Sequence, residues 1–99
     1  MPALLIRAAA ETDMLLAAEW YETRAAGLGT EFLRAVDVCF GLIQRMPQGY
    51  QLVAPDARRA RLRRFPFSVY YVTTPERIAI LAVLHARRDP REWQSRLEA

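Results

Sequence analysis

The most apolar stretch of this sequence is Ile78-Ala79-Ile80-Leu81-Ala82-Val83-Leu84, which contains no polar or charged residue. A strand with one face in water alternates apolar and polar residues, whereas a strand covered on both faces is apolar throughout. We therefore interpret residues 78–84 as the central strand of a sheet covered on both faces. The stretch is much shorter than the ~20 apolar residues of a membrane-spanning helix, and no other run approaches that length.

The sequence on either side of this strand predicts the other elements. Residues 4–6 are a short apolar run typical of a first strand, and two helices follow, the first over about residues 9–26 and the second ended by Pro47. Their predicted apolar faces are Met14, Ala17, Ala18, Tyr21 and Ala25 in the first helix, and Phe32, Val36, Cys39, Phe40, Ile43 and Met46 in the second. Gly27 is expected to end the first helix, and the short connection predicts an antiparallel hairpin.

After the hairpin the pattern changes to that of a meander. A turn-rich loop over residues 47–56 is followed by an alternating strand at 58–64 and a β-branched, aromatic strand at 67–73. Asp89, Pro90 and Glu92 are typical of a helix start, with Asp89 as N-cap and Glu92 in a capping box. Trp93 and Leu97 would dock that helix. The fold class is therefore α+β, in the order β-α-α-β-β-β-α, with a helical hairpin packed on a small, mainly antiparallel sheet and a short C-terminal helix.

Length and composition agree with one domain over residues 1–99. The chain has 99 residues, of which 53% are hydrophobic, which is enough for one modest core and excludes a disordered protein. The single cysteine, Cys39, cannot form an internal disulfide and is interpreted as a core residue. A reducing cytoplasm is the expected compartment, and residues 1–7 lack the features of a signal peptide.

The charges are distributed unevenly along the chain. All 14 basic residues are arginines. Residues 1–56 carry four arginines and seven acidic residues, a net charge of −3, whereas residues 57–99 carry ten arginines and four acidic residues, a net charge of +6. Because arginine binds carboxylates and phosphates bidentately, a positive face of this kind suits an acidic protein or a nucleic acid.

Six arginines form two candidate anion-binding or partner-binding sets. The first set lies on one face of the strand at 58–64 and the second at the start of the last helix; they are Arg59, Arg61 and Arg63, and Arg87, Arg88 and Arg91. A bound anion would explain cations at a helix N-terminus, and so would pairing with Asp89, Glu92 and acids of the first helices. Arg64 falls on the same side of its strand as Leu62, so we expect it to be partly buried and paired.

His85, the only histidine, follows the central strand. It is either a general acid or base with a pKa near neutrality, or a strand-end residue that satisfies local backbone groups, and we favour the second interpretation. One histidine excludes a metal site built on several imidazoles, and no phosphate loop or hydrolase motif is present, so no metal and no cofactor are expected. Tyr21 and Tyr71 are interpreted as core residues rather than as stacking platforms for bases.

Taken together, these pieces resemble the RelE/ParE superfamily of type II toxin–antitoxin toxins over essentially the whole chain. The matching segments are Trp20-Tyr21-Glu22, Gly27-Leu28-Gly29-Thr30-Glu31-Phe32-Leu33, Met46-Pro47, Arg64-Phe65-Pro66-Phe67-Ser68-Val69-Tyr70-Tyr71 and His85-Ala86-Arg87-Arg88-Asp89-Pro90 with Trp93. The resemblance implies a toxin whose partner is a cognate antitoxin with a flexible, often acidic segment that folds onto it.

The superfamily contains two kinds of toxin. One kind cleaves mRNA on the ribosome, and its candidate catalytic residues here are Arg61, Arg64, His85 and Arg87. The other inhibits DNA gyrase without known catalytic residues. Trp93 stands near the place where nucleases of the superfamily carry a tyrosine, and a tryptophan cannot transfer that proton. The resemblance therefore favours gyrase as the target, with an mRNA endoribonuclease or an inactive, antitoxin-binding module as alternatives.

Overall fold

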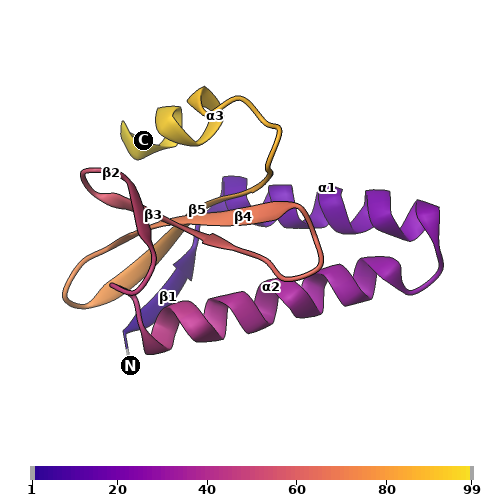
Figure 1. Cartoon of the computed structure of the whole chain (residues 1–99), viewed down its shortest axis with the longest axis horizontal. Coiled ribbons are helices and arrows are strands. Elements are labelled where there is room, and N and C mark those ends of the chain that lie inside the picture. Colours follow the sequence, from indigo (N-terminus) through magenta and orange to yellow (C-terminus); the bar gives the residue numbers. More distant parts are fainter. Residues whose placement is uncertain (1, 99) are drawn as a thin grey trace.

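The computed structural model describes residues 2–98, which form one five-stranded sheet and three helices (Figure 1). The elements in chain order are β1 (Ala3–Ile6), α1 (Ala8–Arg24), α2 (Leu28–Arg45), β2 (Gln51–Ala54), β3 (Ala57–Arg61), β4 (Phe67–Thr73), β5 (Arg77–His85), α3 (Arg91–Gln94) and a 3-10 turn, η1 (Ser95–Glu98). The strand order is β1-β5-β4-β3-β2, with β1 parallel to β5 and every other pair antiparallel. The predicted α+β class is confirmed. No helix within residues 2–98 has the length and apolarity needed to cross a membrane.

The sheet has one strand more than the sequence predicts. Residues 51–54, assigned to the turn-rich loop, form β2, which pairs with β3 through Gln51 and Arg59, and through Ala54 and Ala57. β2 is a short edge strand whose first two residues are exposed, so it has neither the length nor the alternation by which strands are recognised. The residues Pro55 and Asp56, assigned to a loop from the sequence, form the turn of the β-hairpin that joins β2 to β3.

β5 lies inside the sheet and separates two apolar cores. Ile78, Ile80 and Val83 belong to the core beneath the helical hairpin, and Leu81 and Leu84 belong to the core on the opposite face. Strict alternation fails at Leu81 because Tyr70 pairs with Ala82 while Tyr71 pairs with Ile80, which leaves a β-bulge between them. Residues 78–84 are all buried, so the prediction of a strand covered on both faces is confirmed. β5 is an inner strand beside the edge strand β1, and the middle strand of the sheet is β4 rather than β5.

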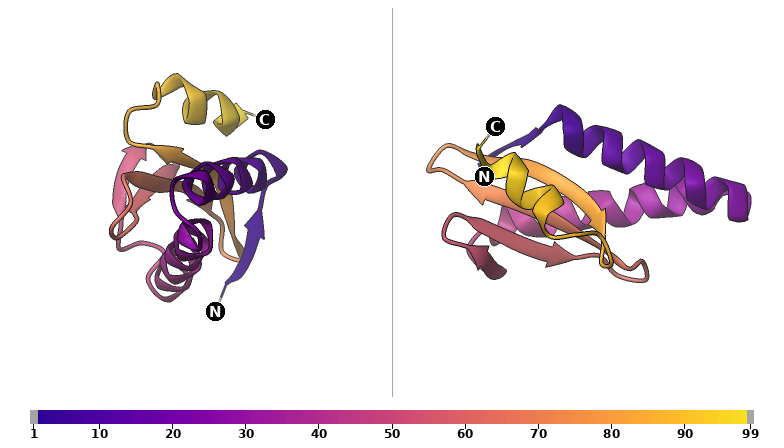
Figure 2. Two further views of the ribbon diagram at one scale, coloured as in Figure 1. Left: turned by 90° about the vertical axis from the view of Figure 1, so that its right-hand side faces the viewer. Right: turned by 90° about the horizontal axis from the view of Figure 1, so that it is seen from above.

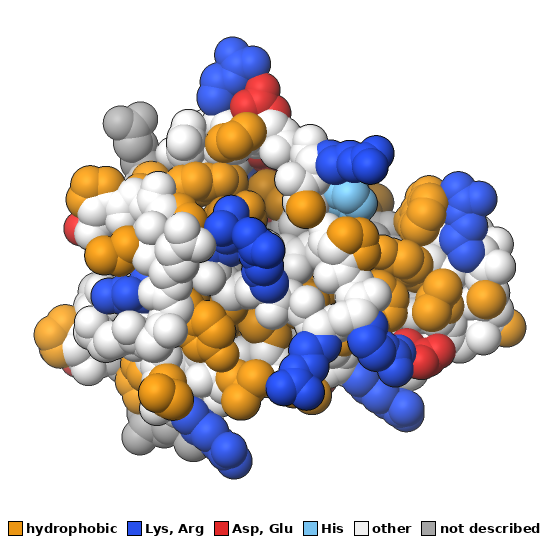
Figure 3. Space-filling model, viewed as in Figure 1, with side chains coloured by type: hydrophobic (Ala, Val, Ile, Leu, Met, Phe, Trp, Pro, Cys, Tyr) orange, Lys and Arg blue, Asp and Glu red, His pale blue; other side chains and the backbone are white. Residues whose placement is uncertain are grey.

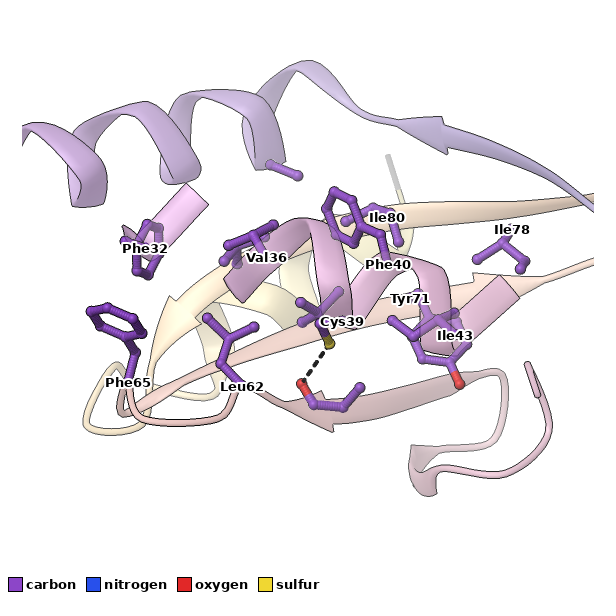
Figure 4. Close-up of a cluster of buried hydrophobic side chains, with 14 of the residues drawn as sticks. Phe32, Val36, Cys39, Phe40, Ile43, Leu62, Phe65, Tyr71, Ile78 and Ile80 are labelled. Carbon is purple, nitrogen blue, oxygen red and sulfur yellow. Dashed lines mark hydrogen bonds between the residues drawn. The ribbon is translucent and has the colours of Figure 1, made fainter. Parts of the chain in front are cut away.

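The larger core is packed by α2 against the sheet (Figure 4). The predicted face of α2 supplies Phe32, Val36, Cys39, Phe40 and Ile43, all buried, and the sheet side supplies Leu62, Phe65, Tyr71, Ile78 and Ile80. Each such side chain contributes about 1.5–3 kcal/mol by its removal from water. The predicted apolar face of each helix includes one residue too many at its C-terminal end. Ala25 is the exposed C-cap of α1 and Met46 is the exposed C-cap of α2.

Glu22 and two glycines close the helical hairpin. The Glu22 carboxylate accepts hydrogen bonds from the backbone N–H groups of Gly27 at 2.8 Å and Gly29 at 2.9 Å, and these bonds cap the first turn of α2. These bonds lower the pKa of Glu22, so their stabilisation is present above the ordinary glutamate pKa of 4.5 and is lost as the pH falls through the lowered value. Gly27, expected at the end of α1, has a φ of 88° and instead occupies the N-cap of α2.

Gly29 also sets the distance between the two helices. A Cβ atom at Gly29 would lie 2.5 Å from the carbonyl oxygen of Ala18, whereas a Cβ at Gly41, farther along α2, would meet nothing within 4 Å. We expect Gly29→Ala to lower the free energy of unfolding by about 1–3 kcal/mol, because one of the helices must move.

Gly41→Ala is the matched control for this substitution. It adds the same methyl group to the same helix in open space, and it should raise the free energy of unfolding by about 0.5–1 kcal/mol. Urea denaturation of both variants measures the difference. Equal effects would show that the approach of α1 to α2 does not depend on Gly29.

The C-terminal segment covers the second face of the sheet, on the side away from α2 (Figures 1 and 2). Trp93 is buried and stacks on Tyr70, with ring centroids 5.0 Å apart and planes inclined by 12°, and Leu97 packs beside them. The predicted docking through Trp93 and Leu97 is therefore confirmed. α3 begins at Arg91 with Pro90 as its N-cap, so the prediction of Asp89 as N-cap is wrong by one residue, although its carboxylate accepts the Arg91 N–H at 2.9 Å.

Beyond the end of β1, the ion pair of Asp13 and Arg96 binds the edge of β5. β1 pairs with β5 only as far as Ile80, and beyond it the Asp13 carboxylate accepts the N–H of Val83 at 3.0 Å. Arg96 donates to the Leu81 carbonyl at 3.0 Å and to both oxygens of Asp13, at 2.7 and 3.2 Å. The side chains of Arg96 and Asp13 are only 18% and 11% exposed, so α1, β5 and η1 are joined by charge-assisted bonds away from water.

Removal of Asp13 should therefore be costly. Asp13→Ala leaves the Val83 N–H unpaired and the largely buried Arg96 guanidinium with only its 3.7 Å approach to Glu92 as an ion pair. We expect the free energy of unfolding to fall by about 3 kcal/mol. Asp89→Ala breaks the exposed pair with Arg91 and serves as the control, with little expected change. Similar urea midpoints for the two variants would contradict this role of the Asp13–Arg96 pair.

Candidate functional site

A groove with a volume of about 530 Å³ lies between α2 and the end of β3. It exists because β2 pairs with β3 only as far as Arg59, so the chain beyond has no strand neighbour on that side. Its apolar part is formed by Ala35, Val38, Cys39 and Leu42 of α2. Val38 and Leu42 are 59% and 40% exposed, and they lie four residues apart on the helix beside the buried face.

Arginines surround this apolar floor. Glu31 is the one acidic residue in the lining, where it faces four arginines and Tyr50; the arginines are Arg34, Arg61, Arg63 and Arg64. In Figure 3, arginine side chains gather below the centre of the face, where Figure 1 shows α2 beneath the sheet, and apolar atoms lie between them. A groove of this composition suits a ligand that carries both apolar groups and negative charges.

Cys39 at the floor of the groove is not a nucleophile. The thiol is buried, its sulfur lies 4.0 Å from the Ala60 carbonyl oxygen (Figure 4), and burial raises its pKa to about 11. A thiol with so high a pKa stays protonated at neutral pH. Cys39 is therefore a core residue at the floor of the groove and is not activated for chemistry.

Arg64 has an unusual backbone conformation at the mouth of the groove. Its φ of 68° is the only positive value outside glycine among the described residues, and it places Arg64 in the left-handed region. The guanidinium pairs with Glu31 at 2.8 Å, with the side chains of Arg64 and Glu31 67% and 49% exposed. The expected pairing is confirmed but the expected burial is wrong. β3 ends at Arg61 and Arg64 lies in the turn that follows, so the alternation of a strand does not set its side-chain direction.

The backbone conformation and the charge of Arg64 can be separated by two substitutions. Arg64→Gly and Arg64→Ala both remove the guanidinium, but only glycine adopts a positive φ without a steric cost. The strained φ destabilises the alanine variant, whereas the greater conformational entropy of the unfolded chain partly offsets this advantage for the glycine variant. The glycine variant should therefore be more stable than the alanine variant by about 1 kcal/mol. Urea denaturation of the two proteins tests this. An alanine variant as stable as the glycine variant would mean that the turn relaxes out of the left-handed region.

The first predicted arginine set is divided by the structure. Arg61 and Arg63 line the groove, Arg63 from the turn rather than from the strand. Arg59 donates instead to the side chain of Gln51 on β2, at 2.9 Å. The neighbouring Arg58, which was not predicted to matter, donates to the Tyr50 carbonyl at 2.6 Å and so supports one wall of the groove. The three alternate arginines do not form one row, because β3 ends at Arg61.

The second predicted set lies at the other side of the sheet. Arg88 pairs with Glu92, and Arg91 pairs with Asp89 at 2.7 Å, which lowers the pKa of Asp89 and raises that of Arg91. Acids of the same segment therefore neutralise two of these arginines, and no bound anion is needed to explain them. Glu92 binds Arg88 and approaches Arg96 rather than closing a capping box.

His85 lies in a separate hollow with Leu16, Phe67, Arg88 and Glu92. Its Nδ1 accepts the backbone N–H of Arg87 at 3.0 Å, and its ring packs edge-on against Phe67. This is the geometry expected of a strand-end residue that satisfies a local backbone group.

Aromatic rings separate His85 from the groove. Arg64 contacts the ring of Phe65 and His85 contacts that of Phe67, and Phe32 lies against both phenylalanines. The structure thus brings Arg61 and Arg64 to one groove and places His85 in another hollow. Arg87 follows His85 and is not part of the groove lining.

The aromatic residues follow the core interpretation. Tyr71 is fully buried, its hydroxyl donates to the Pro47 carbonyl at 2.7 Å, and burial raises its pKa to about 12. Tyr21 is partly buried and stacks on Phe32. The groove residues that sequence analysis did not assign to a site include Glu31, Arg34, Val38 and Leu42. For Val38 and Leu42 the available signal is that apolar side chains continue past the buried face of α2.

Comparison with known proteins bears on the fold. No protein-family model and no curated protein matches the sequence. Among solved structures, a chain of the chromosomal ParDE TA (toxin–antitoxin) system from P. aeruginosa is similar, with a TM-score of 0.63 and 22% sequence identity over 86% of this chain and 96% of that chain. The chain has a ParE-like fold. The architecture that the sequence resemblance implied is therefore confirmed.

Proposed function

We propose that this chain is the toxin of a type II toxin–antitoxin module, a cytoplasmic inhibitor of growth that its cognate antitoxin neutralises by binding. The ParE-like fold, shared over most of the chain with a protein of a ParDE system, supports this assignment. The observation that carries it is the groove between α2 and β3, an exposed apolar floor with four arginines around it. A concave surface that combines exposed apolar side chains with a charged rim suits a protein partner.

The antitoxin segment that suits this groove is acidic and partly apolar. Apolar side chains would cover Val38 and Leu42, and carboxylates would meet Arg34, Arg61 and Arg63. A flexible segment that orders on binding can follow a groove of this length along α2. The remaining predicted residues, Arg59, Arg87, Arg88 and Arg91, lie outside the groove, and any contact they make would be with other parts of a partner.

DNA gyrase is the target that we propose. The supporting observation is that His85 is bound through Nδ1 to a backbone N–H and is separated by aromatic rings from Arg61 and Arg64. Trp93 is stacked inside the second core, where it cannot reach a substrate. The alternative, an mRNA endoribonuclease, is favoured by a single observation, the presence of Arg61 and Arg64 in one groove where a phosphate could be held.

Supercoiling of relaxed plasmid by purified gyrase tests this proposal. We expect the protein to inhibit supercoiling and the product of the adjacent gene, added in equimolar amount, to restore it. His85→Ala should inhibit as strongly as the unchanged protein, because the proposed mechanism does not require proton transfer.

Two other outcomes would contradict the proposal. Growth arrest on induction without gyrase inhibition, together with mRNA cleavage on programmed ribosomes that Arg64→Ala or His85→Ala abolishes, would establish the endoribonuclease. Absence of growth arrest from a folded protein that still binds its antitoxin would establish an inactive binding module.

A further inference from the structure

Arg64 already holds a carboxylate in the free protein, and that carboxylate belongs to the chain itself. Glu31, in the first turn of α2, reaches across the mouth of the groove to the Arg64 guanidinium at 2.8 Å. We propose that Glu31 occupies the position of a carboxylate of the antitoxin, and that the acidic segment binds by displacing Glu31 from Arg64. This inference rests on the proposed function and adds to it the anchoring residue and the chemistry of the bound segment.

The conformation of Arg64 indicates a role in binding rather than in folding. A left-handed φ is costly for a residue with a Cβ, and such strain persists at positions that serve a ligand. Little packing compensates for this cost, because the side chain is 67% exposed. It pairs with Glu31, and its guanidinium lies over the ring of Phe65 at 5.8 Å from the ring centroid. In this conformation the Arg64 side chain lines the groove and meets Glu31.

The Arg64–Glu31 pair is suited to exchange. Both side chains are accessible to water, and an exposed pair between flexible side chains is weak. Glu31 makes one contact with the guanidinium within hydrogen-bond distance, whereas a carboxylate arriving from outside can approach the planar fork with both oxygens. Once Glu31 is displaced, the incoming charge lies among three further arginines that have no acidic partner in the groove lining: Arg34, Arg61 and Arg63.

The floor of the groove selects a peptide over a nucleic acid. Val38 and Leu42 present apolar surface that a phosphate backbone would leave in contact with water, but that leucine-like side chains would cover. The charged rim and the apolar floor lie side by side, so the segment that fits alternates acidic and apolar side chains. We therefore assign the groove to an acidic, apolar segment of a protein, with a carboxylate on Arg64 as its anchor.

Direct binding of a synthetic peptide tests the inference without requiring the antitoxin. The probe is a short, fluorescently labelled peptide of alternating leucine and glutamate, and its counterpart carries glutamine in place of glutamate. Anisotropy at low ionic strength measures the dissociation constants for the unchanged protein and for Arg64→Gly, Arg64→Ala and Glu31→Gln. Arg77→Gln is the matched control, because Arg77 lies by the β4–β5 turn, at the end of the sheet opposite the β3–β4 turn that contains Arg64.

The variants should separate in a defined order. Arg64→Gly and Arg64→Ala should each weaken binding about tenfold, as expected for the loss of one charge-assisted hydrogen bond, although the two variants differ in stability. Glu31→Gln should tighten binding by about two- to fivefold, because the peptide no longer competes with an internal carboxylate. Arg77→Gln should leave the affinity unchanged, and the glutamine peptide should bind weakly to every protein and show no response to Glu31→Gln.

Several results would overturn the inference. Weaker binding by Glu31→Gln would show that Glu31 supports the site rather than competing for it. Equal affinity of the unchanged protein and both Arg64 variants, absence of peptide binding up to about 1 mM, or binding of a single-stranded RNA in place of the peptide would also contradict it. Failure of the proposed toxin function is seen separately, because absence of growth arrest and of gyrase inhibition would leave the order of peptide affinities unaffected.

Discussion

Burial of β5 on both faces is the constraint on which the rest of the structure depends. A strand without a polar residue from 78 to 84 requires cover on each side. The helical hairpin covers one face and the C-terminal segment, through the stacking of Trp93 on Tyr70, covers the other. The edge of β5 needs partners as well, and it has β1 as far as Ile80 and the Asp13–Arg96 pair beyond it. The short C-terminal helix is thus part of the core rather than an appendage.

The arginines have different roles at the two sides of the sheet. In the C-terminal segment, Arg88 and Arg91 are neutralised by neighbouring acids, and Arg96 completes the edge of the sheet. Around the groove the balance differs, since Glu31 faces four arginines above an apolar floor. Apolar surface supplies binding energy and charge supplies selection and approach, so the combination suits a flexible acidic partner better than a small molecule. Part of the arginine excess after residue 57 therefore gathers at the groove, through Arg61, Arg63 and Arg64.

Much of the fold could be predicted from the sequence because its signals are local. The apolar run of β5, the face of α2 from Phe32 to Ile43 and the end of α2 before Pro47 all follow from side-chain periodicity and helix-ending residues. β2 was missed because a short exposed edge strand has no periodicity of its own, and its pairing is fixed by β3. The β-bulge at Leu81 was not predictable either, since it arises from the register between β4 and β5.

The sequence by itself determined the fold class, the strand that is covered on both faces, the composition of the main core and the excess of arginine after residue 57. Only the tertiary structure decided which arginines act together. It placed Arg61 and Arg64 at one groove, left His85 behind the rings of Phe65 and Phe67, and joined Asp13 to Arg96 across most of the chain. The physical reason is that periodicity reports which face of an element is buried. A site, by contrast, depends on where separate elements end and on which residues of distant segments meet there.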